Sequence, residues 1–231
     1  MRVIHPGQRV RGRVPARALL GLLLALSTAA PAARPTAHVS HVRLSDPALA
    51  ATESARERLA YLVGCALPEG TVVDATVDGR TFAFPGSLGL APAWSQRALE
   101  PVEARRVSAC ILSRTNRFGV TVQLSLRGAG LLEADAAERA AFALHEGAFF
   151  GNVFSPTSPA YACSGDAIPD RGRRLGALRR VCGVADGGLT PGGRPSTHCG
   201  FVDVGPCSAR PFVQDGVDYS DAVLDVYLRA P

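Results

Sequence analysis

The chain has 231 residues, 47% of them apolar, so it is long enough to bury one sizeable core. All 25 basic residues are arginine, and five of them precede Ala18, in a stretch without Asp or Glu. The other 20 arginines are balanced by 20 acidic residues, which excludes a nucleic-acid surface built on a general excess of positive charge. We therefore expect no nucleic-acid partner.

The N-terminal segment has the pattern of a secretory signal peptide. A basic stretch ends at Arg17, the apolar run ALLGLLLAL follows, and small residues after this run suit a signal peptidase. The run is shorter than the roughly 18 to 20 residues that span a bilayer, although an uncleaved anchor is the alternative. We expect 1–33 to be a signal peptide, 34–44 a linker and 45–231 one globular domain. The product would be periplasmic or extracellular, without membrane contact after cleavage.

The first predicted element of the domain is a helix over residues 45–64. Asp46 is suited to its N-cap and Pro47 to its first turn, and Gly64 is suited to close it. The pattern therefore places Cys65 just past the helix end.

A hairpin and a second helix follow. TVVDATV, the dipeptide Asp78-Gly79 and RTFAF predict two strands with a tight turn over residues 71–84. Residues 100–116 predict a helix that starts near Pro101 and carries most of its apolar side chains on one face. Cys110 would project inward from that face.

The second half of the domain mixes strand and helix patterns. Alternating apolar residues over 118–128 predict a half-buried strand, and the Ala-rich composition of 133–144 predicts a short helix. Glycines among the aromatic residues of 147–154 indicate a bent strand. A last apolar run, 221–228, predicts a strand that closes the sheet.

Residues 155–211 differ from the rest, because 17 of these 57 residues are Gly or Pro. We expect this region to bury little surface of its own and to be ordered by disulfide bonds. The fold class predicted for the whole domain is α+β: a small, mainly antiparallel sheet with two or three helices and this long disulfide-stapled loop region.

Six cysteines in an exported chain indicate disulfide bonds, and six allow 15 pairings. Their wide spacing, with no C-x-x-C, argues against zinc or thioredoxin-like sites. The sequence does not establish the pairing. The preferred set is Cys65 with Cys110, Cys163 with Cys182, and Cys199 with Cys207.

Several short segments carry a resemblance to other proteins. They are YLVGCALPEG, SLGLAPAW, EGAFFGN, the C-G…G-P-C element at 199–207 and the final D-V-Y-L strand. In these segments the chain resembles a group of exported, cysteine-containing, uncharacterised proteins of GC-rich soil bacteria. The resemblance supports export and disulfide bonding, and it implies no activity, ligand or catalytic residue.

The stretch LHEGAFFGN contains half of a zinc-protease motif. His145 and Glu146 match the start of H-E-x-x-H, in which two histidines one helical turn apart bind the metal. Phe149 stands where the second histidine is needed, so the motif is absent, and we expect no metal or other cofactor. The structural alternative is an ordinary helix-to-strand junction. The candidates for a catalytic site scattered in the sequence are His145, Glu146, Asn152 and His198.

Other polar patterns are interpreted as structural. No G-x-S-x-G nucleophile elbow occurs, the glycines of residues 183–193 lack the lysine of a P-loop, and SGDA at 164–167 suits a turn. His38 and His41 are interpreted as part of a solvent-exposed linker rather than a metal site. Asp215, Asp218 and Asp221 are interpreted as solvated side chains rather than the catalytic carboxylates of a glycosidase.

Two function classes remain open from the sequence. The preferred one is a non-catalytic exported module that binds a protein or polysaccharide surface through loops of residues 155–211. The alternative is an exported hydrolase with a site near His145 and Glu146. The loop residues expected to contact a ligand are Tyr161, Phe201, Phe212, Arg171, Arg173, Arg174, Arg179 and Arg180.

Overall fold

The structure is a computed structural model, and its described residues all belong to the unit His38–Pro231. The expected signal peptide, the arginines of 171–180 and four of the histidines lie outside the described residues. In two strands only the backbone is described. The description covers Leu44 and residues 46–116, 121–155, 157–165, 184–189 (backbone), 195–197 (backbone) and 199–229.

The first predicted helix is divided into a 3₁₀ turn, η2 (Pro47–Ala50), and a helix, α1 (Glu53–Ala66). Asp46 caps η2 as expected, because its carboxylate accepts a hydrogen bond from the backbone N–H of Ala48 at 2.9 Å. Thr52 is a second N-cap: its hydroxyl accepts from Ala55 N at 3.1 Å. The chain therefore restarts its helix six residues after the first cap.

The prediction that Gly64 closes the helix is wrong. Helix α1 continues through Gly64 to Ala66, so Cys65 lies within the last turn rather than past it. Pro68 gives the reason, since a proline disfavours helical backbone in the residue before it. Leu67 is accordingly extended, at φ −97° and ψ 148°.

The predicted hairpin is confirmed as strands β1 (Val72–Val77) and β2 (Arg80–Pro85). Its two-residue turn has φ +49° at Asp78 and +74° at Gly79. Both values lie in the left-handed region that a type I′ turn requires and that Asp-Gly favours. The turn chemistry read from the sequence therefore sets the register of the hairpin.

The second predicted helix is confirmed as α2 (Pro101–Arg114), which follows a 3₁₀ turn, η3 (Pro92–Ser95). The Glu103 carboxylate accepts a hydrogen bond from the backbone N–H of Glu100 at 2.9 Å, which caps the helix start. The same carboxylate accepts two hydrogen bonds from the Arg97 guanidinium, both at 2.8 Å. The N-terminus of α2 is thus fixed by the Glu103 carboxylate, which pairs with both Arg97 and the backbone of Glu100.

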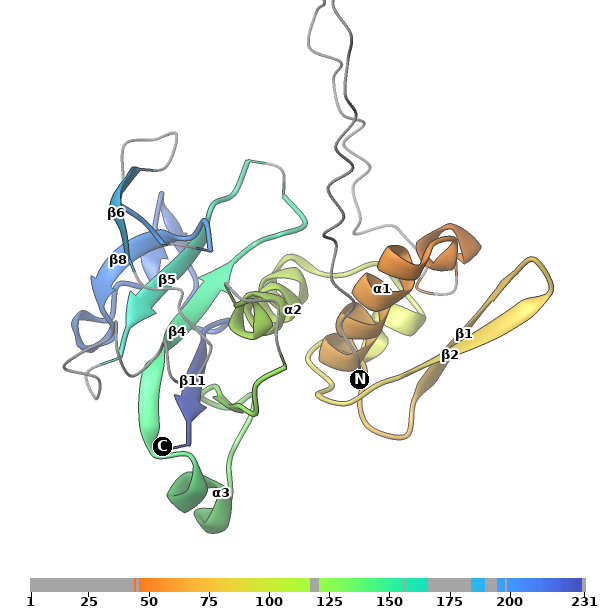
Figure 1. Cartoon of the computed structure of the whole chain (residues 1–231), viewed down its shortest axis with the longest axis horizontal. Helices are drawn as coiled ribbons and strands as arrows, with labels where there is room; N and C mark the ends of the chain where they lie inside the picture. Colours follow the sequence, from red (N-terminus) through yellow and green to blue (C-terminus); the bar gives the residue numbers. More distant parts are fainter. Residues whose placement is uncertain are drawn as a thin grey trace, which may run out of the picture. The chain divides into compact units, whose positions relative to one another are not determined.

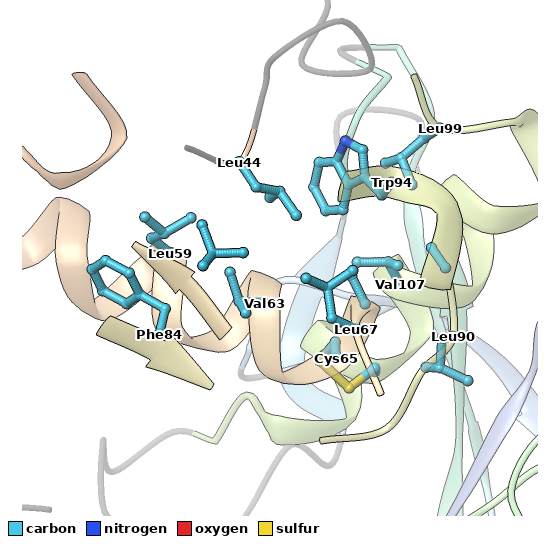
Figure 2. Packing of buried hydrophobic residues seen from close by; sticks show 14 of the residues in the cluster. Leu44, Leu59, Val63, Cys65, Leu67, Phe84, Leu90, Trp94, Leu99 and Val107 are labelled. Carbon is cyan, nitrogen blue, oxygen red and sulfur yellow. A yellow bond between two sulfur atoms is a disulfide. The ribbon is translucent and has the colours of Figure 1, made fainter. Parts of the chain in front are cut away.

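The first hydrophobic core joins α1, the hairpin, η3 and α2 (Figure 2). The predicted bridge between Cys65 and Cys110 is confirmed and crosses this core, linking the two helices with a Cα–Cα distance of 5.9 Å. Side chains from every element meet around it. They include Leu59, Val63, Leu67, Phe84, Leu90, Trp94, Leu99 and Val107, with Leu44 packed against them.

The second half forms a seven-stranded sheet in the order β3-β11-β4-β5-β8-β7-β6. All neighbours pair antiparallel except β5 and β8, which are parallel. The α+β class is therefore confirmed. The strands are β3 (Ser125–Arg127), β4 (Leu144–Gly151), β5 (Ala160–Ser164), β6 (Val184–Leu189), β7 (Pro195–Thr197), β8 (Val202–Pro206) and β11 (Leu224–Leu228).

Short elements accompany this sheet. The helix α3 (Ala136–Ala141) precedes β4, and a 3₁₀ turn, η4 (Cys207–Ala209), follows β8. A small hairpin, β9 (Val213–Gln214) with β10 (Val217–Asp218), comes before β11. Of the strand expected at 118–128, only β3 is formed among the described residues.

The expectation that residues 155–211 bury little surface is wrong. Strands β5 and β8 lie inside the sheet, and Tyr161, Phe201 and Val202 are buried, with exposures of 1%, 4% and 4%. The pairings Cys163–Cys182 and Cys199–Cys207 are wrong as well. Cys163 bridges Cys207, because the parallel register places Ser164 opposite Pro206. Cys199 is also disulfide-bonded, to a partner outside the described residues.

Both faces of the sheet are buried around β4. Helix α2 lies beside β4 (Figure 1). On one face, Leu112 of α2 packs against Phe149 and Val226. On the other, Phe150 and Tyr161 stack at 5.3 Å and are joined by side chains from the segment around β9 and β10. One end of this second face stays half exposed, and the candidate site lies there.

Candidate functional site: an arginine–tyrosine–histidine stack on the sheet

A β-bulge determines where His145 points. Val226 of β11 pairs with Gly147, but the next residue, Tyr227, pairs with His145, so Glu146 is the extra residue of β4. Regular pairing would have placed Glu146 opposite Tyr227. The bulge shifts the alternation of side chains along β4. His145 therefore lies on the same face as Tyr227, while Leu144 lies on the opposite face and packs with the cluster of Phe149 and Val226.

Glycines make this bulge possible. A Cβ on Gly147 would lie 2.2 Å from the backbone oxygen of Cys163, and a Cβ on Gly165 would lie 2.2 Å from that of His145. The backbone N–H of Gly165 donates to the Glu146 carbonyl at 3.0 Å, which ties β5 to the bulge. Gly147, one of the glycines that predict a bend, is thus needed because two strands approach each other closely there.

Three side chains from three neighbouring strands form a stack on this face. The imidazole of His145 is stacked on the Tyr227 ring, with centroids 4.8 Å apart and planes 23° apart. The Arg127 guanidinium carbon lies 3.7 Å from the centroid of the same ring. We call Arg127, Tyr227 and His145 the Arg–Tyr–His stack; all three are half-buried.

A carboxylate holds the histidine end of the stack. Asp225 Oδ1 lies 2.8 Å from His145 Nε2, and the two side chains are 35% and 19% exposed. Among the described residues, the other ring nitrogen, Nδ1, has no hydrogen bond. A neutral imidazole that donates Nε2–H to Asp225 leaves Nδ1 as a proton acceptor.

The three sequence candidates that the structure describes do not form one site. Glu146 is buried at 9% exposure in the bulge, and His198 lies outside the described residues. Asn152 follows the opposite end of β4, about 23 Å along the strand from His145 at 3.3 Å per residue. Its side-chain oxygen accepts a hydrogen bond from Phe154 N at 3.1 Å, which forms a local turn. Only His145 belongs to the stack.

The three aspartates before the last strand are exposed, and each has a local role. Asp215 accepts a hydrogen bond from the Tyr161 hydroxyl at 2.6 Å, and Asp221 lies 3.9 Å from an Arg105 nitrogen. Hydrogen bonds from Ser220 lower the pKa of Asp218. Since the three side chains have different partners, the structure gives no paired carboxylates of the glycosidase kind here.

The aromatic residues expected to contact a ligand are used elsewhere. Tyr161 and Phe201 belong to the core, and Phe212 packs edge-on against Phe150 at 5.5 Å. This corrects the expectation that the loops present them to a partner. The expected arginine cluster at 171–180 lies outside the described residues.

Arg114 is a half-buried arginine at the end of helix α2. Burial lowers its pKa, and the nearby Tyr61 acts in the opposite direction. It ends helix α2, where a positive charge interacts favourably with the carbonyl end of the helix. Its position is therefore explained by the helix alone.

The sequence contained part of the signal for the stack. Asp225 and Tyr227 alternate with the apolar residues of β11, as Ser125 and Arg127 do with Leu124 and Leu126. Alternation identifies the polar face of each strand. It does not show which strands are neighbours, and it carries no sign of the bulge.

Comparisons place the chain in no known group, since no family model, no curated protein and no solved structure matches it. Within the described parts of the chain, no three His, Cys, Asp or Glu side chains are grouped so as to hold a metal ion. No helix in those parts is both long and apolar enough to cross a membrane.

Proposed function

We propose that this chain is an exported, disulfide-stabilised, non-catalytic binding protein, and that the Arg–Tyr–His stack is part of its binding surface. The signal-peptide pattern of residues 1–33 and the bonded cysteines support export. The destination is the periplasm or the outside of the cell. The observation that carries the binding proposal is the stack itself.

The stack has two properties of a binding surface. Its side chains come from the sheet and are held by contacts with one another, so a ligand would find them already ordered. They also have polar atoms without a hydrogen bond to a described residue: His145 Nδ1, the Tyr227 hydroxyl and part of the Arg127 guanidinium. Such groups in a half-buried position favour recognition over packing.

Retention on cell-envelope and polysaccharide fractions tests the binding proposal. The protein is purified from the exported fraction with its disulfides intact, and the wild type is compared with Tyr227→Ala and with the control Tyr61→Ala, which changes an exposed tyrosine on α1. We expect the wild type and the control to be retained and the Tyr227 variant to be lost. Failure of the wild type to bind any fraction would contradict the proposal, as would equal retention of all three.

An exported hydrolase is the second candidate, favoured by the 2.8 Å contact between His145 and Asp225. Asp225 would orient the imidazole, and Nδ1 would take a proton from a water molecule that attacks the substrate. Among the described residues, no hydrogen bond joins His145 to a hydroxyl or a thiol, so the geometry offers no serine or cysteine nucleophile. This candidate ranks second because the described residues supply a base but no side-chain nucleophile and no group of metal ligands.

Turnover separates the two functions. A panel of ester, glycoside and peptide substrates is assayed with the wild type, Asp225→Asn and His145→Gln. A binding protein gives no turnover with any of them. Hydrolysis by the wild type that falls at least about 100-fold in both variants would establish the hydrolase instead, since general-base catalysis contributes on that order.

A further inference from the structure

Arg127 is held along one edge of its guanidinium group. Nε donates to the Ser125 hydroxyl at 3.0 Å, and Nη2 donates to the Phe142 carbonyl at 2.6 Å. An arginine has five N–H donors, so three of them have no acceptor among the described residues. These three include both donors of Nη1. The free edge has the geometry that binds both oxygens of a carboxylate.

The position of Arg127 is fixed before any ligand arrives. Its contact with the Tyr227 ring and its two hydrogen bonds restrict the rotation of a long side chain. An arginine that is already ordered loses less conformational entropy on binding than a mobile one. A preformed cation of this kind raises affinity for a matching anion.

The charge around Arg127 is not balanced. No carboxylate of a described residue forms an ion pair with Arg127, and Asp225, its partner in the β11 register, hydrogen-bonds His145 instead. Arg229 also contacts Phe142: its guanidinium carbon lies 4.8 Å from the ring of the residue whose backbone oxygen accepts from Arg127. Arg127 itself thus carries one positive charge that no carboxylate of a described residue pairs with. One carboxylate group would neutralise it.

The local charge also selects among anions. A phosphate monoester carries nearly two negative charges at pH 7, which is more than this site can compensate. A polybasic surface that binds anionic lipid headgroups typically uses about four to eight Lys or Arg residues. The single uncompensated charge therefore fits a carboxylate better than either of them.

The aromatic rings of the site are already covered. Arg127 and His145, from the strands on either side of β11, both contact the Tyr227 ring, and Arg229 lies over Phe142. A neutral sugar that stacks on an open ring would find no such ring here. The Tyr227 hydroxyl and His145 Nδ1 instead offer hydrogen bonds beside Arg127, as suits a carboxylate flanked by hydroxyl groups.

We propose that the Arg–Tyr–His stack recognises the carboxylate of a uronic-acid polysaccharide, with Arg127 as the residue that binds the carboxylate. The inference rests on the proposed binding function and names its ligand class. Tyr227 and His145 contact the neighbouring hydroxyl groups. Asp225 orients the imidazole and keeps Arg127 free of an ion pair by taking His145 as its partner.

Two polymers that differ only in charge test the inference. The exported, oxidised protein is titrated calorimetrically with polygalacturonate and with the same polymer as its methyl ester, in which each carboxylate is neutral. We expect binding to polygalacturonate and at least tenfold weaker binding to the ester. We expect Arg127→Gln to lose at least tenfold in affinity for polygalacturonate, Arg127→Lys to recover only part of it, and Tyr227→Phe to lose a few-fold.

Arg58→Gln is the matched control, because Arg58 is exposed on α1 and makes one local hydrogen bond, to Ser54. It should bind like the wild type, and near-equal thermal midpoints of all variants would show that each is folded. Equal binding of acid and ester, or full binding by Arg127→Gln, would overturn the carboxylate inference. The proposed binding function would survive either result.

Three further outcomes would also overturn the inference, each with a different consequence. Binding to phosphatidylglycerol vesicles but not to polygalacturonate would replace the polysaccharide with a membrane surface. Retention on other envelope fractions without affinity for polygalacturonate would remove the ligand class alone. Absence of binding to every polymer, vesicle and envelope fraction would remove the proposed function as well.

Discussion

The helical half of the domain, 46–116, and the sheet half, 121–229, use their polar side chains differently. In α2, Glu103 is shared by Arg97 and the helix N-terminus, and the buried Ser108 hydroxyl donates to Ala104 O at 2.6 Å. Two donors of the helical half, Trp94 Nε1 and Arg105 Nε, have no partner among the described residues, but both atoms are fully buried. The Arg–Tyr–His stack of the sheet half leaves several donors without a described partner on atoms that are not fully buried. Polar groups that a fold does not use for itself are the better candidates for function.

Removing each disulfide bond should have the largest effect on stability. The bridges Cys65–Cys110 and Cys163–Cys207, one in each half, close loops of nearly equal length, with separations of 45 and 44 residues. The chain-entropy model then gives a loss of about 4 kcal/mol in the free energy of unfolding for replacing either pair by alanine. Urea denaturation measures both. A loss below about 1 kcal/mol for one pair would show that its half does not depend on the bridge.

Replacing Gly147 by alanine should have the next largest effect, because the new methyl group meets the backbone oxygen of Cys163 and the strands must separate. We expect a loss of about 3 kcal/mol in the free energy of unfolding, in the range of overpacked cores. Gly130→Ala is the control: a Cβ there meets nothing within 4 Å, and its φ of +68° costs an alanine about 1 kcal/mol. Equal losses for the two variants would contradict the bulge geometry.

The sequence predicts the helical half well because its signals are local. Asp78-Gly79 specifies the turn, Pro101 the start of α2, and the bridge Cys65–Cys110 follows from two adjacent helices. The predicted helix end at Gly64 is wrong, because Pro68 and not Gly64 determines where α1 ends.

The sheet half was harder to predict because its contacts join distant segments. The parallel pairing of β5 with β8, and with it the bridge Cys163–Cys207, depends on partners more than 40 residues apart in sequence. The stack depends on three strands and on a bulge that reverses the faces of β4. Periodicity finds polar faces, but neither register nor neighbours.

Replacing Arg127 should affect folding only modestly. Arg127 is half-buried, has no ion pair among the described residues, and contributes a contact with the Tyr227 ring and two hydrogen bonds, which glutamine can replace in part. We expect Arg127→Gln to lower the free energy of unfolding by about 1 kcal/mol. A loss near that of a disulfide would make Arg127 a structural residue and remove the contrast between the halves. Thermal and urea denaturation measure it.

In the helical half, the Glu103 carboxylate should contribute stability that is lost in acid. Burial acts to raise the pKa of Glu103, but hydrogen bonds from Arg97 and Glu100 N, with the charges of Arg97 and Arg106, leave it lowered from 4.5. The ionised carboxylate thus stabilises the fold above pH 4.5, and this contribution is lost as the pH falls through the lower folded pKa.

Glu103→Gln should therefore lose stability at pH 7 and little at pH 3, so the difference in unfolding free energy between the two pH values becomes smaller than in the wild type. Glu57→Gln, an exposed position on α1, is the control and should keep the wild-type difference. An unchanged difference in Glu103→Gln would show that the Arg97 pair contributes nothing.

The claim that the sheet half carries the binding surface is tested most directly by chemical-shift mapping. Backbone amide spectra of the oxidised protein, with its disulfides intact, are recorded with and without short galacturonate oligomers. The account predicts shifts confined to β3, β11 and the start of β4, around Arg127, Tyr227 and His145, and absent from Arg127→Gln. Shifts centred on the β1–β2 hairpin or on α1, or an unchanged spectrum at saturating oligomer, would contradict it.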